Sequence, residues 1–151
     1  MILGTRHTGL VVRDLEQSLG FYRDLLGLPV WQRRVEEGDF IDKVVGIPGV
    51  KLEWAKLFLP DGSLLELLQY HSHPETGPRS PYPANRHGCS HVALTVGDLE
   101  TLFQTLQAHG VTCNSPPQVS PDGRVRVLYC HDPDGIKLEL VEEIKTEIRT
   151  V

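Results

Sequence analysis

Hydrophobic positions near the start of the chain change from a strand pattern to a helical spacing. Residues 7–12 read HTGLVV, a short run rich in β-branched residues that predicts a strand. Asp14 follows where a helix N-cap is expected, because its carboxylate can accept from free backbone N–H groups. Gly27 suits the left-handed conformation that ends many helices. The helix between them is predicted to bury one stripe, made of Leu15, Leu19, Tyr22 and Leu26.

The same pattern returns in the second half of the chain. HTGLVVRDLE at residues 7–16 returns as HVALTVGDLE at residues 91–100, and PDGSLLELL at 60–68 returns as PDGIKLELV at 133–141. Two matches in the same order indicate a tandem duplication of one module. The second helix is expected to begin after Asp98 and to end near Gly110, with an apolar stripe of Leu99, Leu102, Phe103 and Leu106.

Each copy carries further strand-like runs after its helix. Both Pro-Asp-Gly tripeptides are turn sequences, so each is expected to join two antiparallel strands. The predicted strands cover residues 50–59 and 64–70 in the first copy and 124–130 and 136–142 in the second, with one more near 29–35 and near 111–117. We therefore predict an α+β domain over residues 1–151, with module 1 at 1–70, a linker at 71–88, module 2 at 89–143 and a tail at 144–151.

Strand parity separates two histidines from the predicted core. Alternate side chains of a strand share a face. His7 therefore lies opposite to Leu10 and Val12, which are expected to pack against the helix. The same parity places His91 on the corresponding face of the second copy. Both imidazoles are thus expected on the sheet face that the helices leave open.

Two glutamates follow the same rule. Glu66 and Glu139 each lie between two leucines of a predicted strand, so each carboxylate is expected to point away from the helix. If the two modules pair, their inner faces gather four candidate ligands: His7, Glu66, His91 and Glu139. This mixed set suits one divalent ion such as Zn, Ni, Co, Mn or Fe(II), and an octahedral shell would leave two positions for water or substrate.

A simpler interpretation applies to each of these residues alone. One histidine or one glutamate in an amphipathic strand is usually an ordinary packed or solvated side chain. The recurrence of both types in both copies favours the metal site. His71 and His73 fall in a proline-rich linker and are expected to be solvated.

Charge and cysteine content exclude other functions. The chain has 15 Lys and Arg against 20 Asp and Glu, for a net charge of -5, and it lacks the basic cluster typical of nucleic-acid binding. No apolar run approaches the ~18 residues of a membrane span, and no signal peptide is evident, so we expect a cytoplasmic protein. Cys89, Cys113 and Cys130 form no CxxC pair and are expected to be reduced. The expected partner is a small molecule, with no nucleic-acid or membrane partner.

The repeated motifs resemble the vicinal oxygen chelate superfamily. Its members include glyoxalase I, methylmalonyl-CoA epimerase, extradiol dioxygenases, and the fosfomycin and bleomycin resistance proteins. The resemblance rests on HTGLVVRDLEQSLGFYRDLLGL, LLELLQY, SHVALTVGDLE and DPDGIKLELVEE, and it covers nearly the whole chain. It implies two tandem βαβββ modules that form a half-open barrel around a metal site. The ligand order of the superfamily maps onto His7, Glu66, His91 and Glu139.

The chain departs from two subfamilies at informative positions. Val11 and Tyr70 stand where glyoxalase I is expected to have an Arg and an Asn that contact glutathione. Glu66 stands where the epimerase usually has Gln, and the additional catalytic glutamate of the epimerase would fall near Ile47 and Pro48. The segment at residues 46–68 and the long linker nevertheless resemble the epimerase layout.

The resemblance implies a metal-dependent enzyme that moves a proton on a small oxygen-chelating substrate, as a lyase, isomerase or epimerase. Glu139 and Glu66 are the candidate catalytic carboxylates. One alternative is an extradiol-type ring-cleavage dioxygenase, although Glu66 would occupy a position that oxygen chemistry needs open. Another is a non-enzymatic antibiotic-binding resistance protein, a class that typically lacks the metal set. We expect a homodimer, and the modules could pair within one chain or across the dimer.

Overall fold

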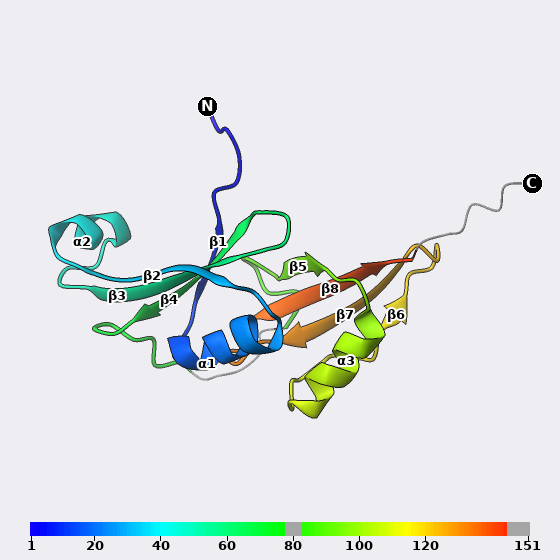
Figure 1. Cartoon of the computed structure of the whole chain (residues 1–151). Helices are drawn as coiled ribbons and strands as arrows, with labels where there is room; N and C mark the ends of the chain where they lie inside the picture. Colours follow the sequence, from blue (N-terminus) through cyan, green and yellow to red (C-terminus); the bar gives the residue numbers. More distant parts are fainter. Residues whose placement is uncertain (78–82, 145–151) are drawn as a thin grey trace, which may run out of the picture. The chain divides into compact units, whose positions relative to one another are not determined.

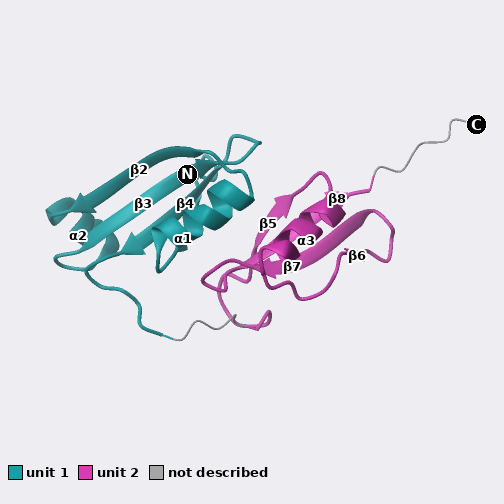
Figure 2. Cartoon of the chain, turned by 60° about the horizontal axis from the view of Figure 1, so that its bottom comes forward, with its two compact units in different colours: residues 1–78 teal, residues 79–151 magenta. Residues whose placement is uncertain are grey.

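The chain forms two units, Met1–Pro78 and Arg79–Val151, which we describe one at a time (Figure 2). The computed structural model describes residues 1–77 and 83–144. The first unit contains β1 (Thr8–Val11), α1 (Leu15–Leu19), the π-helix η1 (Gly20–Leu25), β2 (Val30–Glu37), α2 (Asp39–Val45), β3 (Lys51–Phe58) and β4 (Leu64–Tyr70). The second unit contains β5 (Val92–Thr95), α3 (Leu99–Ala108), β6 (Gln118–Val119), β7 (Val125–His131) and β8 (Lys137–Glu143).

Both units have the same sheet topology. The strand order is β1-β4-β3-β2 in the first sheet and β5-β8-β7-β6 in the second. In each sheet the first strand of the unit pairs in parallel with the last one, and the other pairs are antiparallel. Each sheet is open, and the first helix of the unit, α1 or α3, lies against one of its sides (Figure 1). The predicted α+β fold of two βαβββ modules is therefore confirmed.

The core of each unit lies between its sheet and its long helix. In the first unit Ala55, Leu57, Leu65 and Leu67 are buried beside Leu15 and Leu19 of the helix. In the second unit the core includes Leu99, Phe103, Leu106, Leu128, Leu138 and Leu140. Burying this apolar surface stabilises the fold and determines which strand face points toward the helix.

Both predicted helix N-caps are confirmed. The Asp14 carboxylate accepts from the backbone N–H of Gln17 at 3.0 Å, and the Asp98 carboxylate accepts from that of Thr101 at 3.0 Å. Gly27 and Gly110 have φ values of 75° and 71°, in the left-handed region that was predicted for them. The helix boundaries follow from these capping residues.

The first helix differs from its prediction in its second half. After Leu19 it widens into η1, where the N–H of Leu26 donates to the carbonyl of Phe21 at 2.9 Å. The wider turn rotates Leu26 off the predicted stripe, so Leu26 is only half-buried. Phe21, which the predicted stripe did not include, is buried.

Helix α2 is an element that the sequence patterns did not predict. It lies in the segment by which the first copy exceeds the second, and its Ile41 packs in a cluster with Val50, Leu52 and Trp54. Both oxygens of Asp42 fasten the loop after α2, because they accept from Gly49 N at 2.6 Å and Val50 N at 2.9 Å. Leu52 and Trp54 alternate with the buried residues that face α1. Helix α2 therefore packs on the other face of the first sheet.

The extra strand predicted near residues 111–117 is largely absent. Only a single bridge between Cys113 and Cys130 forms there, and β6 begins at Gln118. The extra strand predicted near 29–35 is present as β2. Part of the predicted linker, residues 78–82, and the predicted tail from residue 145 lie outside the described residues. Within the described ranges, no helix has the length and hydrophobicity needed to cross a membrane.

Candidate metal centre

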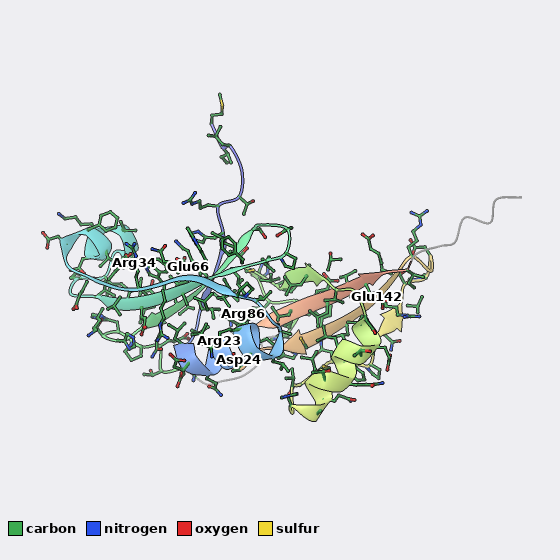
Figure 3. The ribbon with its side chains drawn as sticks, in the orientation of Figure 1. Arg23, Asp24, Arg34, Glu66, Arg86 and Glu142 are labelled. Atoms are coloured by element: carbon green, nitrogen blue, oxygen red, sulfur yellow. The ribbon has the colours of Figure 1, made fainter. Side chains whose placement is uncertain are left out.

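His7 and Glu66 meet on the inner face of the first sheet, the face opposite α1. The Nε2 atom of His7 lies 2.9 Å from Oε2 of Glu66, and their side chains are 31% and 10% exposed. Gly9, two residues after His7, pairs with Glu66 in the parallel register of β1 and β4. Parity therefore brought the predicted pair together as expected. Figure 3 labels Glu66 on its strand.

Gly9, the strand partner of Glu66, lies close to Leu68. A Cβ atom at Gly9 would lie 3.3 Å from Cδ1 of Leu68 and 3.9 Å from a carboxylate oxygen of Glu66. Glycine thus avoids a tight contact with Leu68, while the distance to Glu66 is an ordinary one.

The second unit repeats the arrangement. The Nε2 atom of His91 lies 3.1 Å from Oε2 of Glu139, and their side chains are 31% and 25% exposed. The register pairs Ala93 with Glu139, as it pairs Gly9 with Glu66. Nδ1 of His91 lies 3.1 Å from the Ser90 hydroxyl, which helps to orient the ring. The duplication therefore preserves geometry as well as residue type.

The donor separations suit two adjacent positions around a six-coordinate ion. Metal bonds of roughly 2.0–2.2 Å at a right angle place two donor atoms about 3 Å apart. The separations of 2.9 Å and 3.1 Å agree with this value. They also suit an N–H···O hydrogen bond, so each pair is stable in the metal-free chain.

One atom of the first pair is unsatisfied. Nδ1 of His7 is buried and has no hydrogen-bond partner among the described residues. A buried polar atom without a hydrogen-bond partner costs roughly 1–3 kcal/mol of stability, so a further group that bonds to this nitrogen would stabilise the site. Across residues 1–77 and 83–144, no three His, Cys, Asp or Glu side chains gather into one metal-binding group. The four predicted ligands are therefore present as two His–Glu pairs, one in each unit.

The strand neighbours of the two glutamates differ. Lys56 pairs with Glu66 across β3 and β4, and its Nζ lies 3.3 Å from Oε1 of Glu66. Tyr129 occupies the equivalent place opposite Glu139, with its ring 5.3 Å from that of His91. Burial and the charge of Glu139 raise the pKa of Tyr129, so its hydroxyl stays protonated at neutral pH. The sequence patterns did not single out Lys56. Its place between the buried residues Ala55 and Leu57 nevertheless predicts that its side chain lies on the inner face.

A second His–carboxylate contact lies on the helix side of the first sheet. Nε2 of His71 is 2.9 Å from Oε2 of Glu53, whose other oxygen accepts from Nε of Arg33 at 2.7 Å. Burial raises the pKa of Glu53, but the hydrogen bonds from Arg33 and His71 outweigh it and leave the pKa below its usual value. His73 is exposed and bonds with the neighbouring Ser72. This contact closely resembles the His7–Glu66 pair in chemistry but not in location.

The aromatic residues divide between core and surface. Trp54 is buried in the α2 cluster, while Phe40 is 75% exposed. Tyr70 and Ile47, which stand at positions where known subfamilies carry functional residues, pack against that cluster. This packing explains why an apolar residue stands at position 47 and an aromatic residue at position 70.

Comparison with known proteins shows the family to which the chain belongs. Residues 4–140 match the Glyoxalase/Bleomycin resistance protein/Dioxygenase superfamily. The chain belongs to this superfamily. It is 30% identical over 145 residues to the uncharacterized protein YwkD of Bacillus subtilis, covering 95% of this chain and 99% of that one. It is also 28% identical to the lactoylglutathione lyase of Haemophilus influenzae, over 93% of each chain.

Solved structures of the glyoxalase family share the fold. A glyoxalase family protein from Bacillus cereus superposes with a TM-score of 0.87 at 27% identity, over 96% of this chain and 97% of that one. A glyoxalase family protein from Enterococcus faecalis gives a TM-score of 0.67 at 23% identity, over 93% and 98% of the chains. The fold expected from the sequence is thus that of the superfamily.

Proposed function

We propose that this protein is a divalent-metal-dependent enzyme that binds a small oxygen-chelating substrate and moves a proton on it, as a lyase or isomerase. The observation that carries the proposal is the His–Glu pair, which recurs at the same register in both sheets with separations of 2.9 Å and 3.1 Å. The similarity to proteins named lactoylglutathione lyase supports the same class of reaction.

In this proposal the two pairs combine to hold one ion. His7 and Glu66 come from one unit, and His91 and Glu139 come from another unit, in the same chain or in the second subunit of a homodimer. A bound divalent ion offsets the negative charge that develops on a substrate oxygen when a neighbouring C–H proton is removed.

We assign the proton transfer to Glu139, with Glu66 as the second candidate. The Glu139 side chain is 25% exposed, against 10% for Glu66, so a substrate has better access to it. One oxygen of Glu66 is already held by Lys56. Tyr129, opposite Glu139, carries no positive charge that would compete for the carboxylate. Glu139 is therefore better suited to accept a proton and return it.

The proposal is tested by metal analysis followed by an activity assay. Purified protein should contain a divalent metal, and the loaded protein should form lactoylglutathione from methylglyoxal and glutathione, or exchange a substrate C–H with solvent deuterium. Glu139→Gln should lower kcat by about 100-fold or more, in the range typical of general acid–base groups. Unchanged turnover in a Glu139→Gln variant that still binds metal would contradict the assigned role.

A further inference from the structure

Lys56 places a positive charge directly on a candidate metal ligand. Its Nζ lies 3.3 Å from Oε1 of Glu66, and its side chain is only 18% exposed. The ammonium group also lies over the ring of Trp54, 4.4 Å from the ring centre. These two contacts hold it on the inner face of the first sheet.

The second unit has no lysine at the position equivalent to Lys56. The second unit has Tyr129 at the equivalent register, opposite Glu139. The two units therefore share the His–Glu pair and differ in the charge beside it. The two sides of the site therefore offer different groups to a ligand, a cation in the first unit and a phenol in the second.

The charges around Glu66 leave a surplus once an ion is bound. Without metal, Lys56 already balances the Glu66 carboxylate. A divalent ion balanced by Glu66 and Glu139 leaves the charge of Lys56 uncompensated. Because Lys56 is largely shielded from water, this positive charge is less screened than one on the surface. Arg34 and Glu36 of β2, opposite Trp54 and Leu52, lie on the same face and carry opposite charges, so the uncompensated charge remains that of Lys56.

We infer that Lys56 selects a substrate whose negative charge lies on or beside its chelating oxygens, as in the 2-oxo and 2-hydroxy acids. The inference rests on the proposed function and names its substrate class. Lys56 donates a charge-assisted hydrogen bond to the anionic group, and its contact with Trp54 keeps the ammonium in position.

Glycolate and glycolamide provide a direct test, because they have nearly the same shape and both can chelate a metal through two oxygens, but only glycolate carries a negative charge on a chelating group. Their affinities are measured by calorimetry on the metal-loaded full chain, together with the affinity of the metal-free chain for the metal alone. The variants are Lys56→Met, Lys56→Arg and Lys51→Met. Lys51 is an exposed lysine of the same strand, so its variant matches the change in net charge.

The wild-type preference for glycolate over glycolamide should fall about tenfold in Lys56→Met. It should persist in Lys56→Arg and Lys51→Met, while metal affinity in Lys56→Met stays equal or increases because a competing cation is gone. Normal metal binding with an unchanged preference in Lys56→Met would overturn this inference alone. Failure of the wild-type chain to bind a divalent metal would overturn the proposed function together with it.

Discussion

Replacing Glu66 by Gln removes one negative charge from the candidate centre at nearly constant size. The Glu66 side chain is 10% exposed, and its carboxylate contacts His7 at 2.9 Å and Lys56 at 3.3 Å. Hydrogen bonds to charged groups contribute about 1.5–3 kcal/mol, and a Gln side chain can still accept one of them. We therefore expect the metal-free variant to lose about 1–2 kcal/mol of stability. For a chain of this size, that lowers Tm by roughly 2–8 °C.

The effect of Glu66→Gln on metal-dependent stability should be larger. An ion present at 100 times its Kd stabilises the folded wild-type chain by about 2.7 kcal/mol. If loss of the anionic ligand weakens binding about 100-fold, the same ion concentration adds only about 0.4 kcal/mol. Thermal unfolding followed by circular dichroism, with EDTA or with added divalent ion, measures both quantities.

Glu53→Gln is the matched control. Glu53 also contacts a histidine at 2.9 Å and the cationic side chain of Arg33 at 2.7 Å, but it lies on the face toward α1. This variant should retain the full metal-dependent rise in Tm. The reasoning is wrong if Glu66→Gln retains the wild-type rise, or if Glu53→Gln loses as much of it.

Three further variants or treatments test the fold. Leu67→Ala removes a side chain with 0% exposure and should cost about 2–5 kcal/mol in denaturant unfolding; a cost below 1 kcal/mol would contradict its place in the core. Iodoacetamide at pH 8 should label Cys89 and spare Cys130, because burial raises the pKa of Cys130 to about 12; equal labelling rates would refute this. The backbone and side-chain hydrogen bonds from Thr101 lower the pKa of Asp98, so its stabilising contribution is complete above the pKa of the unfolded chain and is lost as pH falls through the folded-state pKa. Asp98→Ala should therefore differ from wild type in thermal unfolding at pH 7 and converge with it in acid, and a gap that persists in acid would contradict the capping role.

Local patterns predicted much of the fold because each of them has a short-range cause. The N-caps Asp14 and Asp98 accept from backbone N–H groups three residues away. The positive φ of Gly27 and Gly110, which follow the helices, depends only on the glycine itself. Strand parity then placed His7 beside Glu66 and His91 beside Glu139, because the alternation of buried leucines determines which face each strand turns to the helix.

Other features depend on tertiary packing that local patterns do not carry. The π-helical turn after Leu19 moves Leu26 off the buried stripe, and regular helical spacing gives no sign of it. Helix α2 is short, and two contacts outside the helix hold it in place. Ile41 packs on the sheet, and the Asp42 carboxylate binds the loop at Gly49 and Val50. Cys113 and Cys130 lie opposite each other through strand pairing alone, since their spacing in the sequence matches no cysteine motif.

The stoichiometry of bound metal tests the central claim most directly. Four ligands that combine into one centre predict one divalent ion per chain, measured by elemental analysis of the purified protein after saturation and removal of free ion. The single variants His7→Ala and His91→Ala should then each reduce that value strongly, because each removes a ligand from the same ion. Two ions per chain, with each variant losing only one, or no ion at all, would contradict the shared centre.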